Sequence, residues 1–278
     1  MTRPPRRTQR VTPIRPAGRM VRANNRSPMT LDGTRTFVLG VARPLVIDPG
    51  PEDAEHLEAL ERLLARIPPA AIVLTHGHAD HAGNALPLSL RTGAPILMGR
   101  GAPRLPFPPE RISRWLEDGE LLRCEGGPLE VRATPGHAPE HLVFLHRHEQ
   151  GGRALFAGDL FLGVGDTTLV SHPHGSVADY LRSLEVVSGL RPTLIYPAHG
   201  PPLRRPERSI SRYRAHRLER IEQVREALRN GAEAGEEELV ARVYGPDLDP
   251  RLHRAALGSI RAILEFLENE EVGRSWEV

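Results

Sequence analysis

The chain has 278 residues, enough for one large domain with an appended module, and its composition excludes several chemistries. All 37 basic residues are arginine, which excludes a Walker A phosphate loop, a Schiff-base lysine and a serine–lysine dyad. A single cysteine, Cys124, excludes an internal disulfide and a thiolate zinc cluster. No apolar run approaches the roughly 18 residues that a membrane span needs, so we expect no membrane partner.

The charge is unevenly distributed along the chain. Residues 1–26 carry eight arginines and no acidic residue, whereas the other 252 residues carry 29 arginines and 35 acidic residues, a net charge of −6. We therefore predict a disordered Arg/Pro-rich tail at residues 1–12 and a mildly acidic folded body. Because no apolar signal-peptide core is present, we expect a cytoplasmic protein.

Residues 13–206 alternate short apolar runs with breaks rich in glycine and proline. The runs predict strands at 36–39, 44–47, 72–74, 129–133, 142–145, 154–157 and 193–196. Amphipathic periodicity predicts helices at 53–67 and 177–187, and Ser176 is placed to cap the second helix. This segment is therefore predicted to be a layered α/β domain.

Residues 207–278 have a different character. Their periodicity predicts helices at 207–229, 236–244 and 250–268, followed by a short C-terminal strand. We expect a small separate helical module, through which the chain can form homo-oligomers.

One motif concentrates chemistry more than any other segment. Thr75-His76-Gly77-His78-Ala79-Asp80-His81 follows a buried apolar run and precedes a predicted helix. Residues two apart in an extended loop point the same way, so His76 and His78 can converge on one metal ion. The turn into the helix carries Asp80 and His81 to the other side, where a second ion can bind. Imidazole and carboxylate ligands without thiolate favour a catalytic metal site.

Three later strands repeat the arrangement on a smaller scale. Each predicted strand ends in small or ring-constrained residues and then one candidate ligand: His137, Asp159 and His199. Ligands at the tips of several strands form a rigid site beyond the edge of a sheet. With the first motif they supply seven ligands, enough for two metal ions.

This set of motifs, in this order, resembles the metallo-β-lactamase superfamily of binuclear hydrolases. The resemblance implies an αββα sandwich with the metal ions at one edge. It assigns His76, His78 and His137 to one ion and Asp80, His81 and His199 to the other, with Asp159 bridging them. Asp48, in Ile47-Asp48-Pro49-Gly50, matches a supporting carboxylate that orients the site.

Further segments resemble the β-lactamase-like protein 2 branch of this superfamily. They are residues 27–36, Thr167-Thr168 and residues 179–184, and the branch carries a winged-helix-like C-terminal module that fits residues 207–278. The sequence departs from the branch at Arg35, where asparagine is usual. We place Arg35, together with His172 and His174, on loops at the rim of the site, as candidate substrate contacts.

The resemblance implies a hydrolase with two divalent ions, zinc first and manganese or iron as alternatives. The attacking group is a metal-bridging hydroxide, and Asp80 or Asp159 shuttles its proton. Because the folded body is acidic, we favour a small-molecule ester or thioester substrate over RNA. A single-stranded endoribonuclease that uses the basic N-terminus and a non-catalytic metal-binding scaffold are the alternatives.

The other histidines receive weaker predictions. We expect His141, four residues after His137, to support the site rather than to bind metal. The histidines expected to be incidental, on polar faces or turns, are His56, His146, His148, His216 and His253.

Overall fold

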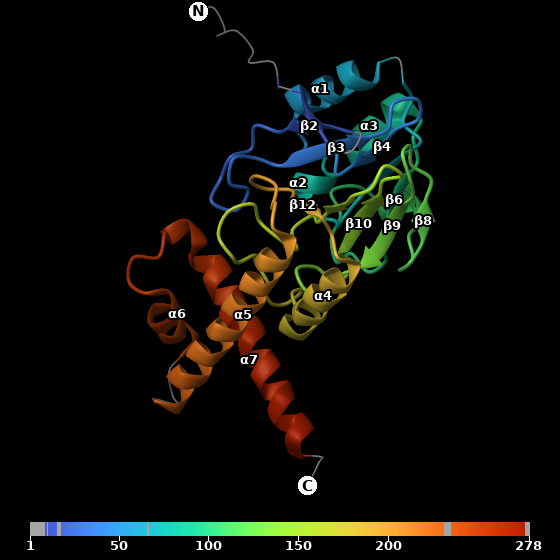
Figure 1. Ribbon diagram of the computed structural model, residues 1–278. Helices are drawn as coiled ribbons and strands as arrows, with labels where there is room; N and C mark the ends of the chain where they lie inside the picture. The colour runs from blue at the N-terminus through green and yellow to red at the C-terminus, as the bar shows by residue number, and fades with distance from the viewer. Residues whose placement is uncertain (1–8, 10, 16–17, 66, 231–234, 276–278) are drawn as a thin grey trace, which may run out of the picture.

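The structure is a computed structural model that describes residues 9, 11–15, 18–65, 67–230 and 235–275. Within these ranges, twelve strands form two sheets that lie face to face (Figure 1). The first sheet has the order β1-β2-β3-β4-β5-β6-β7 and the second β12-β11-β10-β9-β8. The first sheet comprises β1 (Val11–Ile14), β2 (Gly18–Arg22), β3 (Arg35–Leu39), β4 (Leu45–Ile47), β5 (Ala71–Val73), β6 (Ile96–Met98) and β7 (Ile112–Trp115); the second comprises β8 (Leu121–Leu122), β9 (Leu129–Ala133), β10 (Leu142–Arg147), β11 (Arg153–Phe156) and β12 (Leu194–Tyr196).

Helices cover the outer face of each sheet. The helices are α1 (Ala54–Leu64), α2 (Ala79–Ala82), α3 (Ala85–Thr92), α4 (Val177–Leu190), α5 (Pro206–Arg229), α6 (Glu236–Tyr244) and α7 (His253–Ser275), with short 3-10 turns at Pro109–Arg111 and Pro250–Leu252. Figure 1 shows α1 and α3 over the first sheet and α4 over the second, while α5, α6 and α7 extend away from the sandwich. The predicted αββα layering is confirmed.

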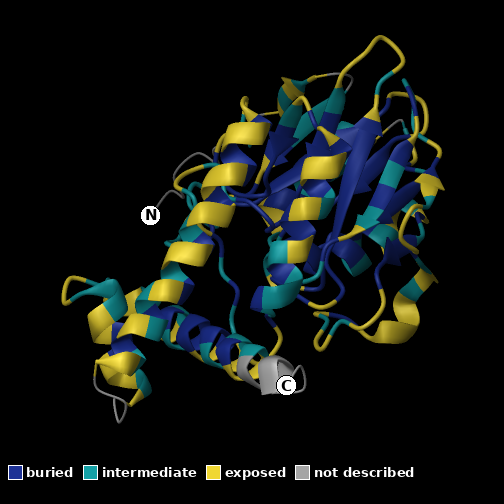
Figure 2. Ribbon diagram, turned by 60° about the horizontal axis from the view of Figure 1, so that its bottom comes forward, coloured by how far each residue is buried: buried dark blue, intermediate teal, exposed yellow. Residues whose placement is uncertain are grey.

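Strand alternation divides the apolar side chains among three cores. In β3, Phe37 and Leu39 point into the core between the sheets, whereas Val38 points to the other face, which packs on α1. Helix α1 presents Leu57, Leu60 and Leu64 to that face, with the Asp53 side chain accepting a hydrogen bond from the His56 N–H as the N-cap. Figure 2 shows the resulting contrast between buried strands and the exposed outward faces of the helices.

The third core crosses the predicted domain boundary. One apolar cluster contains Val143 and Leu155 of the second sheet, Leu184 of α4 and Ile260 of α7. The C-terminal helices therefore pack against the α/β body, and the division at residues 206/207 stays a prediction. The expected C-terminal strand is wrong for the described residues, because α7 continues as a helix to Ser275.

The N-terminal boundary also differs from the prediction. Val11 and Thr12, assigned to the disordered tail, are the first two residues of β1, which pairs antiparallel with β2. The rest of the predicted tail, apart from Gln9, lies outside the described residues. The seven strands predicted at 36–39, 44–47, 72–74, 129–133, 142–145, 154–157 and 193–196 are present, and their ends agree with the structure to within about two residues. The sequence does not predict the other five strands, which are β1, β2, β6, β7 and β8.

His56 is not incidental, because its side chain is fully buried beneath the start of β3. Its Nδ1 donates to Gln9 Oε1 over 2.6 Å, and its Nε2 accepts from Thr36 Oγ1 over 2.7 Å. Burial lowers the pKa of His56 to about 4, against the weaker opposing effect of Asp53. His146 is also buried, so two of the five histidines expected on polar faces or turns belong to the interior.

Candidate metal centre

The histidine motif leaves β5 and turns at once into a helix. The chain passes through Thr75 to His76, and His78 is the N-cap of α2, with extended backbone angles. His76 Nε2 lies 2.9 Å from His78 Nδ1, so the two rings converge as predicted. Asp80 and His81 belong to the first turn and last turn of α2, which directs them to a second group of ligands.

The other three predicted ligands follow the ends of β9, β11 and β12. His137, Asp159 and His199 all lie at the same edge of the sandwich as the histidine motif, because the ligand atoms of the seven residues fall into two compact groups. Gly158 makes the turn before Asp159 with φ +48°. A Cβ atom there would lie 2.7 Å from His141 Nε2, so glycine satisfies both the backbone conformation and the close packing.

The ligand atoms of the seven residues form two groups. Within each group, one ligand atom of every residue lies within 4.8 Å of the others. The first group is His76, His78, His137 and Asp159, and the second is Asp80, His81 and His199. Asp159 reaches both groups, since its Oδ2 lies 3.6 Å from His137 Nε2 and its Oδ1 lies 3.2 Å from His199 Nε2.

Asp48 supports the second group from behind. Its Oδ2 accepts from His81 Nδ1 over 2.9 Å, which leaves His81 Nε2 facing the ligand cluster. Its Oδ1 accepts from the Thr75 N–H, and its Oδ2 also accepts from the Thr75 hydroxyl. Asp48 holds this position with φ +48°, an uncommon backbone conformation that aspartate tolerates better than most residues.

His141 lies beside the site without joining either ligand group. Its Nε2 accepts from the Asp159 N–H over 3.2 Å, and its Nδ1 donates to Thr134 Oγ1 over 2.9 Å. The neighbouring Glu140 uses Oε1 to accept from the Gly77 N–H over 2.9 Å, between His76 and His78. These contacts fix the backbone of the ligand segments, and the sequence signalled only His141 among them.

The pKa values of the imidazoles in the site shift in opposite directions because their surroundings differ. Burial, together with His81 and His137 nearby, holds the pKa of His76 well below its usual value, and burial with His137 lowers that of His78 to about 4. Burial also disfavours the charged forms of His81 and His199, but Asp80 and Asp159 outweigh it. The pKa of His81 is raised well above its usual value and that of His199 to about 9.

This electrostatic pattern fits a cation. His81 Nε2 and Asp159 Oδ1 are buried, lie 3.3 Å apart, and neither forms a hydrogen bond with a described residue. Two carboxylates and five imidazoles thus converge, and the negative charge of Asp80 and Asp159 favours a cation beside them. The donor set of the two groups fits divalent metal ions.

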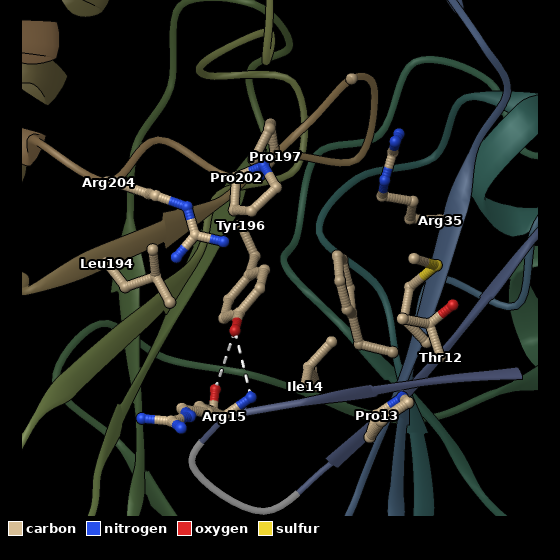
Figure 3. Close-up of a pocket in the computed structure, with 13 residues that line it drawn as sticks. Thr12, Pro13, Ile14, Arg15, Arg35, Leu194, Tyr196, Pro197, Pro202 and Arg204 are labelled. Atoms are coloured by element: carbon tan, nitrogen blue, oxygen red, sulfur yellow. Dashed lines mark hydrogen bonds between the residues drawn. The ribbon is translucent and has the colours of Figure 1, made fainter.

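Arg35 is the first residue of β3 and is buried, so it is not on an exposed rim loop. Its guanidinium pairs with Asp32 at 2.8 Å. It lines a cavity of about 400 Å³ between β1, β3 and β12, where Tyr196 hydrogen-bonds to the backbone of Arg15 (Figure 3). A contact between Arg35 and substrate stays a prediction.

His172 and His174 are exposed on the loop before α4. The His172 N–H donates to Gly258 O of α7, and this hydrogen bond places the loop against the C-terminal helices. Neither histidine belongs to the two ligand groups among the described residues. Their role as substrate contacts also stays a prediction.

The fold and the ligand groups together define a class of protein. Residues 31–199 match the Metallo-beta-lactamase superfamily, and residues 236–274 match the Beta-lactamase associated winged helix domain. The chain belongs to the metallo-β-lactamase superfamily, with the corresponding fold and a C-terminal winged-helix domain, and it is a metal-binding hydrolase. None of the described helices combines the length and apolar character needed to cross a membrane.

Individual proteins of known sequence or structure are also similar to this chain. The chain is 31% identical to the Beta-lactamase-like protein 2 homolog of Caenorhabditis elegans, over 88% of this chain and 81% of the relative. It is 29% identical to an atrochrysone carboxyl ACP thioesterase of Passalora fulva, over 84% of this chain and 69% of the relative. A β-lactamase domain protein from Burkholderia ambifaria superposes with a TM-score of 0.78 at 22% identity, covering 94% of this chain and 89% of that one, which supports the fold.

Proposed function

We propose that the protein is a binuclear metal-dependent hydrolase of a small-molecule ester or thioester. The observation that carries this proposal is the position of Asp159, whose two carboxylate oxygens face separate groups of ligands. A carboxylate shared in this way suits two ions held side by side. His76, His78 and His137 would hold one ion, and Asp80, His81 and His199 the other.

The donor set favours zinc, because it consists of imidazole and carboxylate groups without thiolate. Two divalent ions, when bound, lower the pKa of a water molecule and polarise the carbonyl oxygen of a substrate. The protein's contribution is to fix the ligands on strand ends, where their positions vary little. Asp48 and His141 add hydrogen bonds that hold His81 and the backbone of Asp159 in place.

Asp80 is the carboxylate best placed to accept the proton of the attacking water. Its side chain is 29% exposed, against 13% for Asp159, so a proton can pass from it to solvent. Its contacts with His81, His199 and Thr34 are closest at Oδ2. We therefore assign the proton to Oδ1 of Asp80.

A side-chain nucleophile is not needed for this chemistry, and the one thiol is poorly suited to it. Burial, with Glu125 beside it, raises the pKa of the Cys124 thiol to about 11. A thiolate is therefore scarce at neutral pH. The thioesterase names of several relatives support an acyl substrate, and a thioester is the substrate that we favour.

Metal analysis followed by a substrate panel tests the proposal. The panel comprises S-lactoylglutathione, an acyl thioester, a lactone, a β-lactam and single-stranded RNA at two salt concentrations. We expect two ions per chain and turnover of the thioester or an ester. Both ions without turnover would favour a scaffold, and salt-sensitive RNA cleavage without ester hydrolysis would favour a nuclease.

Two variants test the site assignment directly. Asp159→Ala and His78→Ala should each lose at least one ion and nearly all turnover, because each removes a ligand atom from the cluster. His253→Ala, on an exposed part of α7, is the matched control and should keep both. Normal turnover with unchanged metal content in either ligand variant would overturn the assignment.

A further inference from the structure

Three consecutive backbone carbonyls connect the C-terminal helices with the metal centre. Arg217 Nη2 of α5 donates to Thr168 O over 2.9 Å. His137 Nδ1 donates to the next carbonyl, Leu169 O, over 2.7 Å. Ser259 Oγ of α7 donates to the third, Val170 O, over 3.2 Å. The outer two carbonyls are thus held by the C-terminal helices, and the middle one orients a candidate ligand.

The same loop also holds the shared carboxylate residue. Thr168 Oγ1 donates to the backbone oxygen of Asp159 over 2.6 Å. Thr168 is buried, so solvent does not compete strongly for this hydrogen bond. A displacement of the 168–170 backbone would therefore move both the His137 ring and the Asp159 backbone.

Helix α7 lies directly against this loop. A Cβ atom on Gly258 would lie 1.9 Å from Ser171 Oγ, and Gly258 O accepts from the His172 N–H over 3.0 Å. The contact is direct and includes backbone atoms on both sides. It leaves the loop little freedom to move independently of α7.

Arg217 is an unusual residue for a purely structural position. Its side chain is only 3% exposed, and it forms no ion pair with any residue in the described ranges. Its guanidinium packs over the ring of Tyr180 at 5.2 Å, and its Nε has no hydrogen-bond partner in the described chain. Burial of a charge without a carboxylate is costly, and an apolar side chain would fill the same space at lower cost.

We propose that the C-terminal helices position the metal ligands, and that Arg217 and Ser259 are the positioning residues that act through the carbonyls of Thr168, Leu169 and Val170. The role of the guanidinium is to hold the loop through the hydrogen bond from Nη2 to Thr168 O. The loop in turn holds the His137 ring and the Asp159 backbone. The C-terminal helices α5 and α7 are then part of the metal centre rather than an appendage. This inference rests on the proposed function, in which His137 and Asp159 hold metal.

The experiment uses the full chain and measures zinc affinity by competition with a chelator, together with the unfolding of the metal-free protein. Arg217→Met removes the donors while keeping a long side chain. We expect about a 10- to 100-fold loss of affinity for at least one zinc ion, the range typical when a partner that orients a ligand is removed. The metal-free protein should unfold at the same or a higher denaturant concentration, because a buried unpaired charge has been removed. Arg217→Lys, which keeps one charged donor, should recover part of the affinity.

Two controls separate this inference from its alternatives. Arg214→Met changes an exposed arginine on the same helix and should leave zinc affinity unchanged. His137→Ala tests the ligand assignment itself: if it binds zinc normally, the proposed function fails. Unchanged affinity in Arg217→Met, with loss in His137→Ala, overturns the positioning role alone. If Arg217→Met does not fold, Ser259→Ala decides in its place, and a several-fold loss supports the role whereas unchanged affinity overturns it.

Discussion

Asp48 and His81 form a fully buried pair in which the carboxylate Oδ2 lies 2.9 Å from the imidazole Nδ1. The contact sets the tautomer of His81 that directs Nε2 to the ligand cluster. Asp48 belongs to the turn after β4, whereas His81 belongs to α2, so the pair also ties two segments of the first sheet's edge together.

Asp48→Asn should weaken metal binding without removing a ligand. The amide has one acceptor oxygen, so it cannot accept from both the Thr75 N–H, which donates to Oδ1, and His81 Nδ1, which donates to Oδ2. We expect zinc affinity to fall about 10- to 100-fold. Chelator competition measures the effect, and Asp118→Asn, at an exposed position, is the control. Equal affinities in the two variants would contradict the role of Asp48.

Gly158→Ala should damage both stability and metal binding. The added Cβ would lie 2.7 Å from His141 Nε2 and 2.8 Å from Thr75, at a positive φ angle. We expect a loss of more than about 1 kcal/mol in the free energy of unfolding, since strain and overlap add. Gly189→Ala, in α4 with open space around its Cβ position, should instead be neutral or stabilising. Denaturant unfolding of both variants checks the contrast.

His56 should make the protein less stable as the pH falls from 6.5 towards 4. Above pH 6.5 His56 is neutral in both states and imposes no cost. Below it the unfolded chain binds a proton at the usual pKa of 6.5, whereas the folded chain does so only near 4, so the free energy of unfolding falls. The loss attributable to His56 is about 3 kcal/mol by pH 4.

His56→Gln isolates this contribution, because the amide does not titrate. The difference in unfolding free energy between the two proteins, measured in urea from pH 7 to pH 4, should shift in favour of the variant as the pH falls. A difference that is independent of pH would show that His56 does not set this dependence.

Ile260→Ala should destabilise the whole chain rather than the C-terminal helices alone. Ile260 is fully buried in the core that α7 shares with β10, β11 and α4. We expect a cost of about 2–5 kcal/mol and a single unfolding transition by circular dichroism. Leu218→Ala, 39% exposed on α5, should cost far less. Two separate transitions would indicate an independently folding module.

The candidate ligands leave a clearer signal in the sequence than the groups that hold them in place. His76, His137, Asp159 and His199 stand within four residues of the ends of apolar strands, so a local pattern was enough to single them out. Leu169 O, by contrast, orients His137 through a backbone carbonyl that no residue type marks. Contacts between a backbone and a distant side chain leave no signal in a single sequence.

The elements that the sequence missed have a similar explanation. Strands β1 and β2 lie in an arginine- and proline-rich segment with low local strand propensity. They are stabilised by pairing, because β2 pairs with β3 and β1 pairs with β2. His56 follows an acidic N-cap and resembles an exposed helix residue until Gln9 and Thr36 are seen to enclose it. Contacts between residues far apart in the sequence determine both the formation of these strands and the burial of His56.

Each group of candidate ligands draws on both sheets. His76 and His78 follow β5 of the first sheet and His137 follows β9 of the second; Asp80 and His81 likewise face His199 across the gap. An ion in either group would act as a cross-link between the two halves of the sandwich. Occupancy would then add to folding stability by mass action, by about 4 kcal/mol at a free-ion concentration a thousand times the dissociation constant. A rise in melting temperature with zinc concentration would therefore measure how much the bound ions stabilise the association of the two sheets.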